Sequence, residues 1–200
     1  MANLLSYFLP AYFVAYFGIA FVLKSVLVAR RIGKSPLVFP DRDSAYGLIG
    51  FYFKLLLLAI FGYVMLYAVF TEWHPNFLPI FLPAAGELRY LGLILLAVSL
   101  LWTIWAQVNM KDSWRIGIDH DTKTALITKG LFSISRNPVF FGMLLSLAGL
   151  FLVTPNALTL LFLIVGYILI QIQIRLEEDF LQQQHGDLYQ NYKQRVRRLI

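Results

Sequence analysis

The chain has 200 residues, of which 59% are hydrophobic and 14% are charged, and its mean hydropathy is +0.68. Soluble domains are nearer half apolar and a quarter charged, so this composition indicates an integral membrane protein. The net charge of +6 is then more typical of membrane topology than of nucleic-acid binding, and the lack of cysteine excludes disulfides, thiol nucleophiles and cysteine metal sites.

Five apolar runs predict membrane-spanning helices, since a span needs about 20 mainly apolar residues. The first three runs cover residues 5–27, 46–70 and 91–108. The fourth, residues 139–153, gives only roughly 22 Å of helix. We therefore expect it to form a helical hairpin with the fifth run. The turn would lie at Thr154-Pro155, read as a cap and a helix-opening proline, and the fifth helix would leave the membrane and end near Gly186.

The basic residues are distributed unevenly between the loops. Fifteen of the 17 lie in or beside the first loop, in the third loop or near the C-terminus. They are Lys24, Arg30, Arg31, Lys34, Arg42, Lys111, Arg115, Lys123, Lys129, Arg136, Arg175, Lys193, Arg195, Arg197 and Arg198. The positive-inside rule then predicts five spans, with the N-terminus outside and the C-terminal helix and the active site in the cytoplasm. A bacterial inner membrane or its equivalent would suit this topology.

The chain is expected to form a single all-α membrane domain over residues 1–200. Residues 1–108 would supply the first three spans, and residues 109–200 a cofactor-binding loop, the hairpin and a C-terminal helix. No Gly-rich nucleotide-binding motif occurs, so a cofactor would have to be held by loop and helix ends at the membrane surface. The three histidines lie far apart and in no ligand spacing, so no metal site is expected.

Polar residues gather where the fifth run leaves the membrane. Gln171, Arg175 and Glu178 are spaced to share one stripe of a helix, and Gln173 and Glu177 share the neighbouring stripe. Polar groups beside an apolar run are costly unless they face a cavity or each other. Two interpretations stay open at this point. The stripe is either part of a site, or a solvated face on which Arg175 pairs with Glu178 or Asp179.

Three segments together resemble the isoprenylcysteine carboxyl methyltransferase family, to which phospholipid N-methyltransferases are related. They are WRIGID (114–119), ALITKGLFSISRNPVFFG (125–142) and EEDFLQQQHGDLYQNYKQRV (177–196). The family pattern is roughly L-V-T-x-G-x-Y-x-x-x-R-H-P-x-Y-x-G, followed by E-E-x-x-L-x-x-x-F-G-x-x-Y-x-x-Y-x-x-x-V. The pieces are individually short, and their order and spacing carry the resemblance, which begins at Trp114.

The resemblance implies a membrane methyltransferase that uses S-adenosylmethionine, held at the cytoplasmic face between the loop and the fifth helix. Glu177 would meet the polar end or the ribose of the cofactor, and Arg136 and Arg175 would be candidates for holding a carboxylate. The loop residues implied to contact the cofactor are Ala125, Leu126, Ile127, Phe132, Asn137, Pro138 and Phe140. Asn137 stands where the family usually has histidine, and Phe132 and Phe140 stand where it has tyrosine.

The favoured substrate is a lipophilic, isoprenylcysteine-like carboxylate that enters laterally from the bilayer, with membrane lipids as the other partners. Methyl transfer to a carboxylate neutralises two charges, which an apolar pocket favours, and it needs no base. One alternative is the amine of a phospholipid headgroup. It would need a base, for which Glu178 is the near candidate. Another is a related membrane reductase or isomerase using NADPH, and a non-catalytic membrane protein or transporter is ranked last.

Overall fold

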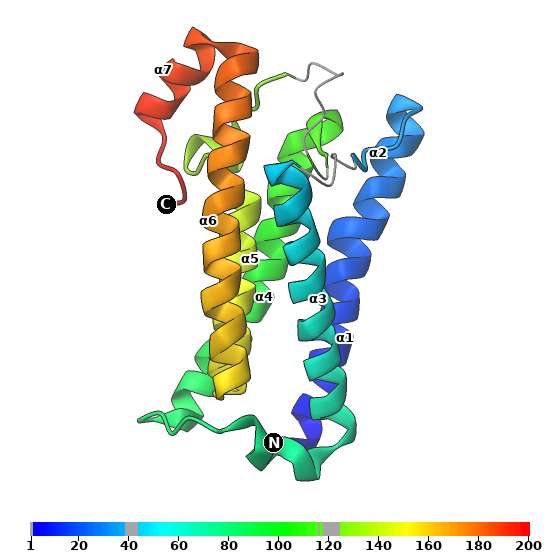
Figure 1. The fold of residues 1–200 in the computed structure, drawn as a ribbon, viewed down its shortest axis with the longest axis vertical. Coiled ribbons are helices and arrows are strands. Elements are labelled where there is room, and N and C mark those ends of the chain that lie inside the picture. Colours follow the sequence, from blue (N-terminus) through cyan, green and yellow to red (C-terminus); the bar gives the residue numbers. More distant parts are fainter. Residues whose placement is uncertain (1, 39–43, 116, 118–124) are drawn as a thin grey trace.

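The computed structural model describes residues 2–38, 44–115, 117 and 125–200, which form a helical bundle without a named β-strand (Figure 1). The all-α membrane fold is therefore confirmed. The elements are α1 (Ala2–Phe17), the π-helix η1 (Gly18–Leu23), α2 (Lys24–Ile32), α3 (Ala45–Val69), η2 (Thr71–Phe77), α4 (Ala85–Met110), η3 (Lys111–Ser113), η4 (Gly130–Ser133), α5 (Pro138–Val153), α6 (Ala157–His185) and α7 (Asp187–Arg195). Arg42, His120 and Lys123 lie outside the described residues.

Four helices in the described part of the chain are long and apolar enough to cross a membrane. They are Leu4–Ile32, which joins α1, η1 and α2, and then Ala45–Val69, Ala85–Ser113 and Ala157–His185. The shorter α5 has 16 residues, or about 24 Å of helix. It forms the expected hairpin with α6 and lies against α4 and α6 within the bundle (Figure 1).

The hairpin turn differs in one detail from the prediction. The N-cap of α6 is Asn156, not Thr154. The Asn156 side chain accepts from the Thr159 amide at 3.0 Å, and the Thr159 hydroxyl accepts from the Asn156 amide at 3.3 Å. Thr154 instead ends α5, where its hydroxyl donates to the Leu150 carbonyl at 3.0 Å. Asparagine and threonine are both good caps, so residue type alone did not decide between them.

Small residues allow α4 and α5 to approach closely along their length. A Cβ atom on Gly142 would lie 2.2 Å from the Thr103 hydroxyl, and one on Gly149 would lie 2.9 Å from the Gly92 carbonyl oxygen. Close backbone approach of this kind is a common basis of helix association in membranes. It fixes the start of α5, and with it the polar segment that precedes α5, against the C-terminal half of α4.

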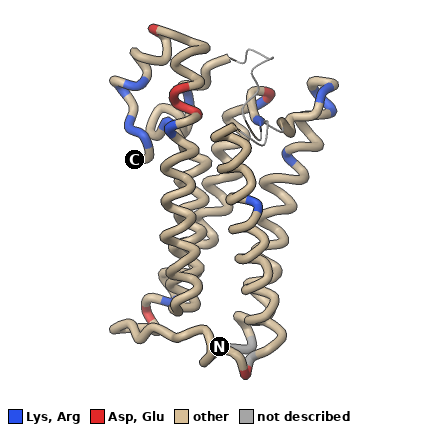
Figure 2. Tube along the Cα trace, viewed as in Figure 1, with Lys and Arg blue, Asp and Glu red and all other residues tan. Residues whose placement is uncertain are grey.

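Charged residues gather at the two ends of the bundle (Figure 2). Lys54 lies within α3. We call one of these the basic end: it contains the ends of α2, α4 and α6, the start of α5 and all of α7 (Figure 1). Arg30, Arg31, Lys111 and Arg136 lie there. The opposite end carries Glu72, Glu87 and Arg89. The predicted separation of charge is present in the fold, while the membrane side that each end faces stays a prediction.

Candidate active site

The site begins where the loop after α4 turns into α5. Pro138 occupies the first turn of α5, where its lack of an N–H group costs nothing. Proline also disfavours a helical Asn137, which has φ −131° and ψ 56° and lies outside the helix. The Asn137 amide donates to the Ser135 hydroxyl at 3.1 Å. This local geometry sets the side chains of Arg136 and Asn137 beside the end of α6.

Glu178 is the centre of a buried polar cluster at this position. Its side chain is only 4% exposed. Arg136 donates to Oε1 through Nε at 3.1 Å and through Nη2 at 2.9 Å. Arg198 donates to Oε2 through Nη2 at 2.9 Å and through Nε at 3.2 Å, and Asn137 approaches Oε1 at 3.4 Å. Two guanidinium groups and one carboxylate therefore form a cluster with a net positive charge. We call it the Glu178 cluster.

The C-terminal tail, residues 196–200, completes the cluster with its backbone. Arg136 donates its amide to the Arg197 carbonyl at 2.9 Å, within a parallel bridge between Ser135 and Arg197. The Arg136 Nη1 group donates to the carbonyls of Val196 at 2.6 Å and Lys193 at 3.0 Å. The tail turns back from α7 toward α6 (Figure 1). Four of the five guanidinium N–H groups of Arg136 are thus committed to protein acceptors.

Two tyrosines of α7 lie beneath the cluster and are buried. The Tyr192 hydroxyl donates to the Phe132 carbonyl at 2.6 Å, which ties α7 to η4. Burial raises the pKa of Tyr189 and that of Tyr192, so both phenols stay protonated at neutral pH. The bonded carboxylate of Glu178 raises the pKa of Arg198, which keeps this guanidinium charged.

The other predicted loop residues precede or follow this point. Phe132 is buried in η4, and Phe140 is half-buried on the first turn of α5 and packs against the core. The Pro138 carbonyl accepts from the Trp102 indole at 2.9 Å. Ala125, Leu126 and Ile127 lie on the segment before η4, where the Ala125 carbonyl accepts weakly from the Ser113 hydroxyl at 3.4 Å.

The predicted residues of α6 face different directions. Glu177 accepts from Gln173 at 2.8 Å, on the stripe beside that of Glu178. Arg175 is exposed, and its Nη1 group donates to the Gln171 carbonyl at 2.6 Å and to the Gln171 side chain at 3.0 Å. The interpretation that Arg175 pairs with Glu178 or Asp179 is therefore wrong, because Glu178 is turned inward to Arg136 and Arg198.

Sequence reasoning missed Arg198 and the C-terminal tail. Both were counted only among the basic residues that indicate topology. The one available signal was an adjacent arginine pair, Arg197 and Arg198, directly after the segment that contains Tyr189 and Tyr192. That signal does not distinguish a buried ion pair from a charge at the membrane surface.

Two polar atoms near the end of α6 are buried and lack a partner among the described residues. They are the side-chain oxygens of Gln182 and Gln184. Gln182 lies one helical turn after Glu178. Buried oxygens of this kind are nearly always hydrogen-bonded, so these two can accept from the donor groups of a ligand. Amino or hydroxyl groups would fit them.

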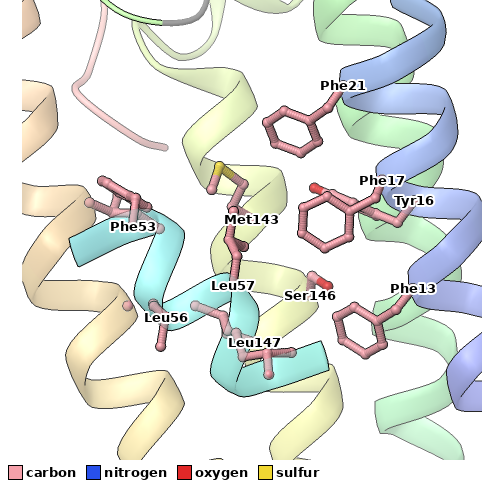
Figure 3. Close-up of a pocket in the computed structure, with 13 residues that line it drawn as sticks. Phe13, Tyr16, Phe17, Phe21, Phe53, Leu56, Leu57, Met143, Ser146 and Leu147 are labelled. Atoms are coloured by element: carbon pink, nitrogen blue, oxygen red, sulfur yellow. The ribbon is translucent and has the colours of Figure 1, made fainter. Parts of the chain in front are cut away.

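An apolar hollow opens between the helices of the bundle (Figure 3). It is open between the helices, and its empty space counted together with that opening is about 480 Å³. The residues that line it are Phe13, Tyr16, Phe17, Phe21, Phe53, Leu56, Leu57, Ile60, Met143, Ser146, Leu147, Gly166 and Ile170. Met143 follows Asn137 by six residues, so the hollow begins about 9 Å further along α5.

A family model described as phospholipid methyltransferase matches residues 88–188. No curated protein matches the chain significantly. The matched segment includes nearly all of α4, all of α5 and α6, and the start of α7. It contains every residue predicted for the site, whereas Arg198 and the C-terminal tail follow it.

Proposed function

The chain belongs to the phospholipid methyltransferase family and is a membrane methyltransferase, and we propose that it methylates the carboxylate of a lipophilic, isoprenylcysteine-like acceptor with S-adenosylmethionine. The observation that carries this choice of acceptor is the state of Glu178. Two guanidinium groups hold its carboxylate, so it is a poor proton acceptor. A carboxylate acceptor has no proton to lose and needs no base.

The residues at the basic end suit the proposed cofactor. S-adenosylmethionine supplies an electrophilic methyl group on a positively charged sulfur. The free oxygens of Gln182 and Gln184 can accept from amine or hydroxyl groups, and Glu177 remains the predicted partner for the polar end or the ribose. The loop contacts proposed are those predicted above: Ala125, Leu126, Ile127, Phe132, Asn137, Pro138 and Phe140.

Arg136 and Arg175 receive different roles in this proposal. Arg136 has little capacity left for a ligand, because four of its N–H groups already donate to Glu178 and to the tail. We therefore assign it as a positioning residue that fixes the start of α5. Arg175 is exposed on α6, and among the described residues its Nη1 group donates to Gln171, so it is proposed to attract the acceptor carboxylate with its other donors.

The apolar hollow supports a lipophilic acceptor. Its walls are aromatic and aliphatic side chains from α1, η1, α3, α5 and α6 (Figure 3). A carboxylate oxygen forms the new bond to carbon as the carbon–sulfur bond breaks, and the products are a neutral ester and a neutral thioether. Because charge disappears during this step, apolar surroundings favour it. The main task of the residues is then to hold the two reacting groups in line.

The second candidate acceptor is the amine of a phospholipid headgroup, which the description of the matching family favours. An ammonium group must lose a proton before it can attack a methyl group. With Glu178 held between two arginines, the remaining nearby carboxylate is Glu177, which accepts a hydrogen bond from Gln173. This reaction would therefore assign Glu177 as the base.

Labelled methyl transfer distinguishes the two acceptors. The purified protein is incubated with methyl-labelled S-adenosylmethionine and either N-acetyl-S-farnesylcysteine or phosphatidylethanolamine vesicles. Mild base releases the methyl group of an ester as volatile methanol but leaves an N-methyl group in place. Base-labile label in the farnesylcysteine arm is expected. Stable label in the lipid arm alone would select the amine acceptor, and no transfer to either would remove both.

Calorimetry tests cofactor binding separately from acceptor choice. Glu177→Ala, Gln182→Leu and Gln184→Leu are each expected to weaken S-adenosylmethionine binding about tenfold, the usual cost of a lost hydrogen bond to a charged or buried group. Gln183→Leu is the matched control, since Gln183 lies between the two on the exposed side of α6. Equal binding by all four variants would show that the cofactor lies elsewhere.

A further inference from the structure

A second hollow lies on the other side of the bundle, between the first long helix and α4. It encloses about 660 Å³, including open space. Among the described residues, Lys24, Arg31 and Lys111 line it, and no Asp or Glu does. The apolar side chains of Leu23, Leu27 and Val108 line it as well. We call it the basic groove; it shares no lining residue with the apolar hollow or the Glu178 cluster.

The three basic residues line the groove from α2 and from the end of α4, and we call the space between them its mouth. Lys24 and Arg31 are seven residues apart on α2, so they lie on the same face about 10 Å apart along the helix. The Lys24 ammonium donates to the Lys111 carbonyl at 3.3 Å, across the gap between α2 and the end of α4. Lys111 has φ 49°, a left-handed conformation that is uncommon for lysine.

Within the described part of the chain, acidic side chains compensate little of this positive charge. Asp112 is the acidic group paired with Arg31, at 3.8 Å, and both side chains are more than half exposed. Exposed pairs of this kind contribute little. The mouth therefore carries an excess of positive charge at the basic end of the bundle, where Figure 2 shows basic residues on α2 and beside the end of α4.

The walls of the groove are held at a fixed spacing within the bundle. Gln107 of α4 is buried and donates to the Ala20 carbonyl at 2.7 Å. Ala20 belongs to the π-helix η1, and π-helical turns often occur at functional positions. Among the apolar lining residues, Leu23 is 49% exposed, Leu27 44% and Val108 61%. On membrane-spanning helices these side chains face lipid.

We propose that the basic groove binds one anionic phospholipid. Its phosphate lies between Lys24, Arg31 and Lys111, and its chains lie along Leu23, Leu27 and Val108. The basic side chains match the headgroup, and the apolar walls match the chains. Basic pockets between membrane helices bind anionic headgroups in this way. A soluble anion would make no use of the apolar walls.

Native mass spectrometry of the full-length protein tests the proposal. The protein is titrated with palmitoyl-oleoyl phosphatidylglycerol or with the phosphatidylcholine that has the same chains. One phosphatidylglycerol molecule is expected to be retained in preference to phosphatidylcholine. In the double variant Lys24→Gln/Arg31→Gln, the preference for phosphatidylglycerol should fall roughly tenfold or more, since each cation near a membrane surface contributes measurably to anionic-lipid binding. Equal retention of the two lipids by the wild type would overturn the proposal.

Two controls separate the groove from general charge. Arg30→Gln/Arg195→Gln removes two exposed cations that do not line the groove, and it should keep the preference. Lys24→Arg/Arg31→Lys retains both charges and should also keep it, even if the glutamine variant folds poorly. Glycerophosphoglycerol, which has the headgroup but no chains, should not displace the bound lipid. Displacement by it, or equal loss in the Arg30→Gln/Arg195→Gln control, would contradict a phospholipid site.

Discussion

Glu178 shows how single residues organise the basic end. A carboxylate this deeply buried is stable only when its charge is compensated, and Arg136, Arg198 and Asn137 supply the donors. These partners come from the loop before α5 and from the C-terminal tail. One side chain on α6 therefore holds together two segments that are separated by 60 residues of chain.

Neutralising this carboxylate should destabilise the protein. Glu178→Gln leaves two guanidinium groups facing one amide, and we expect the free energy of unfolding to fall by about 3 kcal/mol. This is the low end of the range for breaking a buried pair, because the Arg198 side chain is 36% exposed. Unfolding in mixed micelles measures the change. Glu177→Gln is the matched control and should cost less than about 1 kcal/mol, since Gln173 can still donate to it. Equal losses in the two variants would contradict the arrangement.

The hydroxyl of Tyr192 is expected to secure α7. Tyr192→Phe removes the bond to the Phe132 carbonyl and leaves that buried acceptor without this donor, which should cost about 1–2 kcal/mol. Limited proteolysis should then cut after Lys193 or Arg195 faster than in the wild type. Tyr167→Phe changes an exposed tyrosine in the same way and should leave the cleavage rate unchanged.

At the scale of the elements, the pairing of α4 with α5 positions the site. Gly142 lies against Thr103, whose hydroxyl is also 2.9 Å from that of Tyr16 on α1. The Ser99 hydroxyl donates to the Gly142 carbonyl at 2.9 Å. Close packing and interhelical hydrogen bonds thus connect three helices near the first turns of α5. The orientation of α5, and hence of Asn137, depends on this contact.

A single methyl group should disturb this pairing. In Gly142→Ala the new Cβ would lie 2.2 Å from the Thr103 hydroxyl, so the Thr103 side chain or one of the helices must shift, and we expect the free energy of unfolding to fall by about 1–3 kcal/mol. Methyl-transfer activity should fall with it, because the start of α5 moves. Gly62→Ala on α3 meets nothing within 4 Å and is the control. Thermal melting in detergent measures both variants, and a neutral Gly142→Ala would refute the close contact.

The apolar runs of the sequence predict where the helices lie better than they predict which helices pack together. Four runs and the hairpin were located closely, because a membrane span requires a long apolar segment whatever it packs against. Two ends were misjudged: the first helix continues through Arg31 to Ile32, and α4 begins at Ala85. Both extensions are polar turns beyond the apolar runs. Helical hydrogen bonding continues there, although hydropathy no longer indicates it.

The sequence named several residues for the site, but it did not predict the contacts between them. The resemblance pointed to Arg136 and Asn137 but not to Glu178, which was named only as a possible base for an amine acceptor, and the structure brings these three together. It did not indicate that Arg136 donates to Glu178, nor that Arg198 completes the cluster. The hydrogen-bonded residues are 20, 42 and 60 positions apart in the chain. The packing of α5, α6 and the tail brings them together, and a single sequence does not show that packing.

At the scale of the whole molecule, charge asymmetry predicts orientation. The basic end has most of the Lys and Arg residues in the described chain, and the opposite end has few (Figure 2). Retention of basic loops in the cytoplasm would place the Glu178 cluster and the basic groove on that side. Both the proposed cofactor and an anionic inner leaflet would then be available to the same end of the bundle.

Cysteine labelling can test this orientation directly, because the native sequence has no cysteine. Single cysteines at Glu72 and Glu87 should react with a membrane-impermeant maleimide added to intact cells. Cysteines at Lys129 and Asp187 should react only after the membrane is permeabilised. The reverse pattern would place the basic end outside the cell, and labelling of all four in intact cells would indicate mixed insertion.

The C-terminal tail has a consequence for how the protein is made. During synthesis Arg136 and Glu178 are both made before Arg198, so the second guanidinium partner of Glu178 is the last to be added. The parallel bridge at Ser135 must also wait for Arg197. Insertion of the helices and completion of the site are therefore separate events, and nascent chains halted before residue 197 should be fully inserted yet lack a finished site.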